Sequence, residues 1–143
     1  MQDVDWFTKS KEPDLNEEFI RKHQDKVYWN CISACQVLSE PFIREFQDRV
    51  AWDDISCHQI LSEPFIREFQ DKIDWRCISF YQVLSEAFIR EFQDEIGWFW
   101  IPYSQKLSRD FILEFANKLD ISKVLDQQEL DLETIEYLKL LKG

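Results

Sequence analysis

Cysteine and histidine side chains are the groups in this chain best suited to bind a metal ion. Cys31 and Cys35 are four residues apart, which places them on one face of a helix, and Cys57 is followed directly by His58. On two neighbouring helices, these four side chains would be able to converge on zinc. Because no Cys-x-x-Cys pair is present, ordinary thiols without a ligand are the favoured interpretation.

The same residues form a poor nucleophilic pair. Cys57 and His58 are sequence neighbours whose side chains diverge on a helix, and no third group that would orient the histidine is evident. The sequence also lacks a phosphate-binding glycine loop and the signatures of metalloproteases and kinases. The four cysteines, which include Cys77, lack the spaced framework of a secreted protein, so we expect reduced thiols. We therefore expect no enzymatic activity, no cofactor and no bound metal.

These residues lie within a repeat. The block LSEPFIREFQD begins at Leu38, recurs unchanged at Leu61, and recurs at Leu84 with Pro changed to Ala. A fixed period of 23 residues is typical of a repeat array, in which each repeat buries its apolar face only against its neighbours. The positions that keep this period are Leu15, Leu38, Leu61, Leu84, Leu107, Leu130, Trp6, Trp29, Trp52, Trp75 and Trp98.

Each repeat is predicted to contain two short helices. Ser39 is placed to cap a first helix over residues 40–50, and Leu38 can pack against Ile43 across that cap. A second helix is expected to begin near Trp52. The equivalent caps are Ser62, Ser85 and Ser108 for first helices, and Asp74 and Asp120 for second helices.

The repeats predict an all-α fold, a right-stacked α-solenoid of two-helix repeats that forms a single domain over residues 1–143. Residues 1–14 would be an N-terminal half-repeat, and residues 130–143 a C-terminal capping helix. The apolar LKLLKG end leaves open a monomer or a homodimer joined through the end caps. The five full repeats are residues 15–37, 38–60, 61–83, 84–106 and 107–129.

Acidic residues dominate the charge of the chain. A formal net charge of −11 disfavours direct binding to nucleic acid or to an anionic membrane surface. No apolar run is long enough to span a membrane, and the N-terminus is acidic where a signal peptide would be basic. We therefore expect a soluble, cytoplasmic protein.

The charges on the first helix are four residues apart and opposite in sign. Glu40 with Arg44, Arg44 with Asp48, and Glu45 with Arg49 are predicted to pair along one solvated helix face. The alternative is that surplus carboxylates stacked from repeat to repeat imitate a row of phosphates. The interleaved basic residues argue against this second interpretation.

The string LSEPFIREFQDKIDWRCISFYQ, residues 61–82, resembles a family of mostly uncharacterised repeat proteins from large DNA viruses, bacteriophages and some bacteria. Their repeats look like LSEDFIREFKDKVDWYCISKYQ, and the likeness extends from Leu15 to about Gln128. IPYSQ at residues 101–105 and ISKVLDQQ at residues 121–128 depart from the pattern. The resemblance implies a viral or phage setting, in which small acidic proteins often inhibit host defence, and it brings no active site.

Comparison of the repeats with one another separates scaffold from candidate surface. A glutamine that recurs at positions 36, 59, 82, 105 and 128 is predicted to form a buried ladder between repeats. The variable positions gather on the second helix, as expected for a binding surface on a constant scaffold. Filling of a kink at Gly97 and Pro102, or packing on the atypical fifth repeat, remains the alternative role for the aromatic residues there. The candidate partner-binding residues are Phe80, Tyr81, Phe99, Trp100, Tyr103, Asp53, Asp54 and Asp74.

The sequence thus favours an acidic, non-enzymatic module that binds a host protein with a basic surface. Such a host protein would be a nucleic-acid-binding defence effector, and an anti-CRISPR protein is one example of this kind of inhibitor. A self-assembling structural scaffold is one alternative, and a zinc- or thiol-dependent enzyme is a second.

Overall fold

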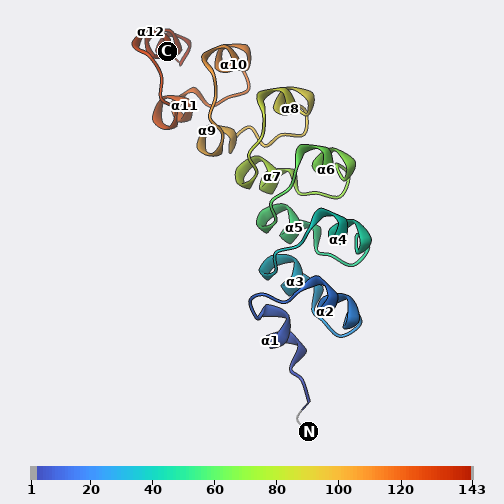
Figure 1. The fold of residues 1–143 in the computed structure, drawn as a ribbon. Coiled ribbons are helices and arrows are strands. Elements are labelled where there is room, and N and C mark those ends of the chain that lie inside the picture. The colour runs from blue at the N-terminus through green and yellow to red at the C-terminus, as the bar shows by residue number, and fades with distance from the viewer. Residues whose placement is uncertain (1–2, 143) are drawn as a thin grey trace. The chain divides into compact units, whose positions relative to one another are not determined.

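The computed structural model describes residues 3–142, and every regular element in that range is an α-helix (Figure 1). The chain divides into two compact units, residues 1–74 and 75–143. The first unit contains α1 (Trp6–Lys11), α2 (Glu17–Lys22), α3 (Trp29–Cys35), α4 (Glu40–Glu45), α5 (Trp52–His58) and α6 (Glu63–Glu68). The second contains α7 (Trp75–Tyr81), α8 (Glu86–Glu91), α9 (Ile101–Ser104), α10 (Arg109–Glu114), α11 (Ile121–Gln127) and α12 (Leu132–Lys142).

The helices keep the 23-residue period. In the first unit α3 begins at Trp29 and α5 at Trp52, and in the second unit α8 begins at Glu86 and α10 at Arg109. Successive second helices pack together within each unit, α1 against α3 and α3 against α5, then α7 against α9 and α9 against α11 (Figure 1). The predicted fold class, an all-α helical-repeat solenoid, is confirmed. The sense of stacking and the single domain stay predictions.

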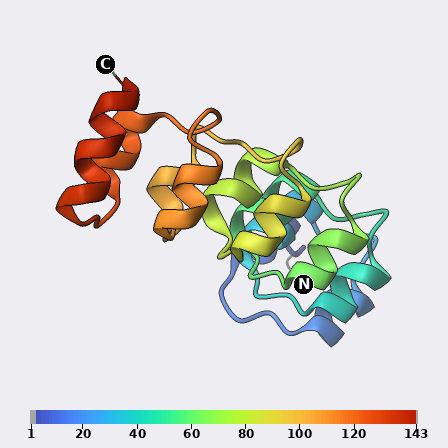
Figure 2. The same ribbon diagram turned by 90° about the horizontal axis from the view of Figure 1, so that it is seen from above.

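The two terminal segments each contain one helix. The predicted half-repeat 1–14 contains α1, and the predicted capping segment 130–143 contains α12, the red helix in Figure 2. Residues 1, 2 and 143 of these predicted segments lie outside the described residues. Helix α12 does not end after six residues as α4 and α6 do, but continues for eleven.

The predicted serine caps are present. The Ser39 hydroxyl accepts a hydrogen bond from the Phe42 amide over 3.2 Å, and Ser62, Ser85 and Ser108 cap α6, α8 and α10 in the same way. The predicted Asp120 cap is also confirmed, because its carboxylate accepts the amides of the first turn of α11. The capping role of Asp74 stays a prediction.

The first helix of the repeat is shorter than predicted. It was expected to span residues 40–50, but α4 ends at Glu45 and the chain turns back over the next five residues. Two side chains hold this turn by binding carbonyl groups that a longer helix would use. The Gln47 side-chain amide donates to the Arg44 carbonyl over 3.0 Å, and the Trp52 indole N–H donates to the Gln47 carbonyl over 2.9 Å.

Aromatic stacking joins one repeat to the next. Trp52 begins α5, and its ring lies 6.3 Å from Phe65 and 4.9 Å from Phe69, which belong to the next repeat. Phe65 is almost fully buried, and the tryptophan is half-buried because its indole edge closes the turn before its own helix. The recurring tryptophans therefore pack between repeats, as the spacing predicted, and each of them is half-buried.

The glutamine ladder is present in both units. The Gln59 side-chain amide donates to the carbonyls of Ser33 and Gln36, and its oxygen accepts the amide of Leu38. Gln105 repeats this pattern in the second unit, with the Ser79 and Gln82 carbonyls and the Leu84 amide. Both glutamine side chains are buried. Each rung therefore satisfies three backbone groups that would otherwise be unpaired in the interior.

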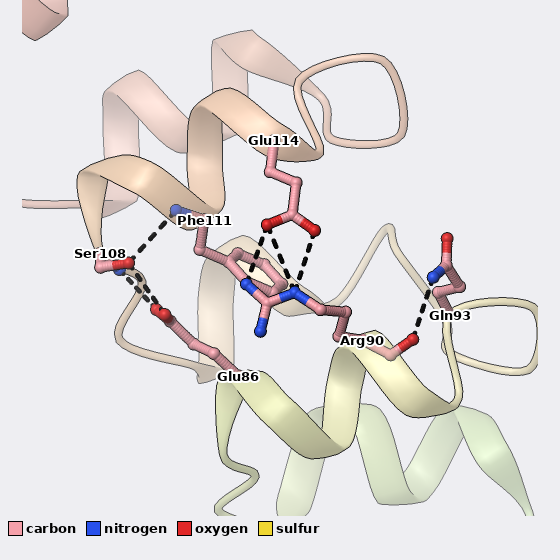
Figure 3. A network of polar contacts seen from close by, with 6 residues as sticks. All are labelled: Glu86, Arg90, Gln93, Ser108, Phe111 and Glu114. Atoms are coloured by element: carbon pink, nitrogen blue, oxygen red, sulfur yellow. Dashed lines mark hydrogen bonds and ion pairs between the residues drawn. The ribbon is translucent and has the colours of Figure 1, made fainter.

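The charges of the first helix pair between repeats, not along the helix as predicted. Arg21 binds Glu45 over 2.9 Å, and Arg44 binds Glu68 over 2.8 Å. The second unit shows the same arrangement in Figure 3, where Arg90 binds Glu114 and Glu86 accepts the amide and hydroxyl of Ser108. A helix of six residues has too few turns for an internal ladder, so the bases reach the acids of the adjacent repeat.

Candidate partner-binding surface

The fourth full repeat departs from the others in its second helix. This helix, α9, is only four residues long, and residues 98–100 form a turn before it. Pro102 occupies the position that Ser79 has one repeat earlier. Gly97 lies just before the turn, and a Cβ atom built on it would come within 3.2 Å of Cδ1 of Trp100. The second helix of this repeat is therefore shortened by a turn between Gly97 and Pro102, and Trp100 packs over the glycine.

Five aromatic side chains gather beside this turn, and we call them the aromatic cluster. Phe80 contacts both Tyr81 and Trp100, with ring centroids 4.8 and 5.2 Å apart. Phe99 contacts Trp100 at 4.8 Å and Tyr103 at 5.9 Å. The structure thus joins, through successive ring contacts, all five aromatic residues predicted for partner binding: Phe80, Tyr81, Phe99, Trp100 and Tyr103.

Exposure distinguishes two roles within the aromatic cluster. Trp100 is half-buried and fills the space above Gly97, as the structural alternative expected. Tyr81 and Phe99 remain 59% and 56% exposed, and Phe80 and Tyr103 remain 37% and 38% exposed. Large exposed rings in mutual contact cost free energy in water, so they mark a surface suited to a partner.

A groove lies next to Trp100. It has a volume of about 300 Å³ and is lined by Arg76, Cys77, Phe80, Tyr81 and Trp100. Arg76 and Cys77 were not among the predicted site residues. Their signal was their place in the variable part of the second helix, beside Phe80 and Tyr81.

Tyr103 is tied to the following repeat. A hydrogen bond from Lys123 to the Tyr103 hydroxyl raises the pKa of the Lys123 ammonium, and Asp120 and Asp126 add to this effect. The lysine belongs to α11, so Tyr103 lies between Phe99 of its own repeat and a side chain of the following repeat.

The acidic candidates belong to the first unit. Asp53 is exposed in the first turn of α5, and Asp54 beside it is half-buried. Burial raises the pKa of the Asp54 carboxyl, and the neighbouring Asp53 charge raises it further, while His58 at 4.0 Å acts in the opposite direction. Asp74 is half-buried, and its amide donates to the Ser56 hydroxyl over 2.9 Å.

The cysteines do not form the zinc site that the sequence left open. Cys31 is buried and Cys35 is exposed, and both are free thiols. The expectation of four reduced thiols is wrong for Cys57 and Cys77, because each of them takes part in a disulfide. A sulfur in a disulfide is not a thiolate ligand, so the set that included Cys57 and His58 is lost. Within residues 3–142, no three histidine, cysteine or acidic side chains are grouped to bind a metal.

A serine in the second helix is a structural residue that the sequence interpretation missed. Ser33 donates to the Trp29 carbonyl over 2.7 Å and accepts the Ala51 amide of the next repeat over 3.0 Å. Ser10 and Ser79 make the same two bonds. The recurrence of this serine every 23 residues was the available signal. The backbone amide that its hydroxyl accepts lies 18 residues away, so the neighbouring sequence does not identify it.

Comparison with protein-family models, with curated proteins and with solved structures finds no match to the chain. No helix among the described residues has the length and apolar character needed to cross a membrane.

Proposed function

We propose that this chain is a non-enzymatic module that binds another protein through the aromatic cluster. The observation that carries the proposal is the contact network of exposed rings on α7, in the turn at residues 98–100 and on α9. At the positions of Phe99 and Tyr103, the first two full repeats carry small or polar residues, so packing of the repeat does not require rings there. Aromatic side chains of this kind supply most of the binding free energy at protein interfaces.

The net charge of −11 supports a partner with a basic surface, because opposite charge accelerates encounter. We infer that the target is a nucleic-acid-binding defence protein of a host cell and that the chain inhibits it, in a viral or phage setting and in the host cytoplasm. The resemblance of the repeats to viral and phage proteins supports this setting. The exposed carboxylate of Asp53, with Asp54 and Asp74, would contact the basic surface.

The acidic surface would not act as a copy of duplex nucleic acid. Arg21, Arg44 and Arg90 bind the recurring glutamates of the first helices, so these acids do not form a continuous row of unpaired charge. The proposed inhibitor therefore acts through aromatic contacts, with charge as a long-range steering force.

Affinity capture with a matched variant tests this proposal. A nuclease-treated lysate of the host cell is passed over the wild-type protein and over a Phe99→Ser/Tyr103→Ser variant whose helical circular dichroism is unchanged. We expect a nucleic-acid-binding protein on the wild type alone, with an association rate that falls steeply as salt rises. The purified partner should lose its nucleic-acid binding when the wild type is added. Equal capture by both proteins, or a partner that keeps its nucleic acid, would contradict the proposal.

Self-assembly is a second candidate, favoured by α12. This helix leaves Leu132, Tyr137, Leu140 and Leu141 exposed, while Leu138 is buried. An exposed apolar helix face is suited to a second copy of the chain. Sedimentation equilibrium over a hundredfold range of concentration tests it. A constant monomer mass removes this candidate, and a mass that rises for the wild type but not for Leu140→Glu supports it.

A further inference from the structure

One side of α12 corresponds to the side that an earlier first helix turns toward the next repeat. In α8, Glu86 and Arg90 each bind a side chain of the repeat that follows (Figure 3). Two repeat periods later, the same two positions carry Leu132 and Glu136 of α12. Within residues 3–142 no helix follows α12, and this side of it is exposed to solvent.

Leucines stand on this side of α12. Leu132, Glu136 and Leu140 are each four residues apart, so they share one helix face, which we call the α12 outer face. Leu132 is 76% exposed and Leu140 is 80% exposed, whereas Leu138 on the opposite side is fully buried and anchors the helix. The charged glutamate of α8 is therefore replaced by an exposed leucine at the end of the array. Exposed leucines on one face are suited to another apolar surface.

Charged side chains beside these leucines have no partner in the chain. Among the described residues, Glu136, Lys139 and Lys142 make no ion pair, although the first helices of earlier repeats pair their charges across the repeats. The acids Glu133 and Glu136 lie in the N-terminal half of α12, and the two lysines lie in its C-terminal half. The helix dipole favours this order of charges, but it gives no reason for the exposed leucines.

A second copy of α12 in antiparallel orientation would satisfy both features. The acidic half of each helix would then lie beside the basic half of the other. With a pairing centred near residue 137, Leu132 of one copy lies within about 3 Å of Leu140 of the other along the helix axis, and Glu136 lies within about 1.5 Å of Lys139. A parallel pair would instead place Glu136 beside Glu136.

We propose that the α12 outer face is a two-fold interface that binds the same face of a second copy of this chain in antiparallel orientation. Such an interface is self-complementary, as two-fold symmetry requires. Pairing of one eleven-residue helix buries less than the roughly 1,200 Å² of a stable complex, so the dimer is weak. A lipid surface fits this face less well, because Glu136 lies between the two leucines and the net charge of −11 repels anionic headgroups. This inference rests on the second candidate function, self-assembly, and names its interface and orientation.

Exchange of the two charges tests the orientation. Sedimentation velocity up to millimolar concentration should show that the wild type dimerises, and that Glu136→Lys and Lys139→Glu each dimerise about tenfold more weakly, because like charges then meet in the interface. Glu136→Lys makes the chain less acidic, so repulsion between net charges alone would tighten its dimer. An equimolar mixture of the two variants should associate as the wild type does, into heterodimers that native mass spectrometry identifies by mass.

A matched pair of variants tests the leucines. Leu140→Ser should abolish the dimer with unchanged helical circular dichroism. Ile60→Ser removes an equally exposed aliphatic side chain from another part of the array and should dimerise as the wild type does.

The outcomes that overturn the inference differ in what else they remove. A wild type that is monomeric at every concentration removes both the inference and the self-assembly candidate. A wild-type dimer that Glu136→Lys tightens, or that the mixture of variants does not restore, overturns the antiparallel interface alone. Neither result bears on capture of a host protein through Phe99 and Tyr103, which is measured separately.

Discussion

The side-chain nitrogen of Gln59 lies 2.6 Å from the backbone carbonyl oxygen of Gln36, the equivalent residue one repeat earlier. Gln105 binds the Gln82 carbonyl and Gln128 binds the Gln105 carbonyl in the same way, so the contact that joins these repeats is polar and directional. Apolar packing alone would permit neighbouring repeats to slide. The ladder fixes their register, because only one position satisfies all three backbone partners.

Replacing Gln59 with leucine should therefore destabilise the fold strongly. The variant leaves two buried carbonyls and one amide without partners, which we expect to lower the free energy of unfolding by about 2 to 4 kcal/mol. Urea unfolding followed by circular dichroism measures the change. Ile60→Ala is the matched control, because the adjacent Ile60 is 95% exposed and its truncation should change stability very little. Equal effects of the two substitutions would contradict the structural role of the ladder.

Backbone strain at Asp14 predicts the order of stability of three proteins that carry glycine, aspartate or valine at position 14. Asp14 has a φ of 66°, in the left-handed region that glycine adopts freely and β-branched residues adopt poorly. We expect Asp14→Gly to be neutral or stabilising by up to about 1 kcal/mol, and Asp14→Val to be destabilising by about 1 to 2 kcal/mol. The urea midpoints of the three proteins decide this order. A valine variant as stable as the glycine variant would show that the loop adopts another conformation.

The inter-repeat ion pairs predict a loss of stability in acid. The hydrogen bond from Arg21 lowers the pKa of the Glu45 carboxyl below its ordinary value of 4.5, and Arg90 lowers that of Glu114. A carboxyl whose pKa is lower in the folded state stabilises the fold above the unfolded pKa, and this contribution disappears as pH falls through the folded pKa. Unfolding midpoints measured from pH 7 down to pH 3 should fall most below about pH 4.5.

A double variant isolates this contribution. Glu45→Gln/Glu114→Gln should lose less stability over the same pH range than the wild type, because neither position then titrates. Glu136→Gln is the control, since Glu136 is exposed on α12 and has no ion pair among the described residues. If the double variant follows the same pH curve as the wild type and the control, the two ion pairs do not contribute to acid sensitivity.

The local signals of the sequence predicted the starts of the helices better than their ends. Ser39 and Ser108 cap their helices where expected, because a cap acts on amides only three residues away. The end of α4 at Glu45 was missed, because it depends on Trp52, whose indole binds the Gln47 carbonyl in the intervening turn. A helical periodicity does not reveal such a competing hydrogen-bond donor.

The ion pairs were predicted along the helix for a related reason. Spacing in sequence identified Glu40 and Arg44 as neighbours, yet Arg44 binds Glu68 and Glu40 accepts the amide of Ser62. These contacts span 22 to 24 residues, so they depend on how the repeats stack. The aromatic cluster was easier to predict, since Phe99 and Trp100 stand at positions that vary among otherwise similar repeats. The contribution of Arg76 to the groove required the structure.

Gly97 links the scaffold to the proposed binding surface, so Gly97→Ala should affect binding more than stability. The added Cβ would come within 3.2 Å of Trp100 Cδ1 and 3.5 Å of the Ser79 hydroxyl oxygen. Because Trp100 is only half-buried, its ring can move outward by a few tenths of an ångström, and we expect a cost of at most about 1 kcal/mol. The displaced ring should weaken partner binding and shift the tryptophan fluorescence.

Ala51, the glycine's counterpart two repeats earlier, already carries the Cβ atom, so Ala51→Gly is the matched control and should leave partner binding unchanged. Unchanged partner affinity in Gly97→Ala, together with a displaced ring, would show that the position of Trp100 does not matter for recognition.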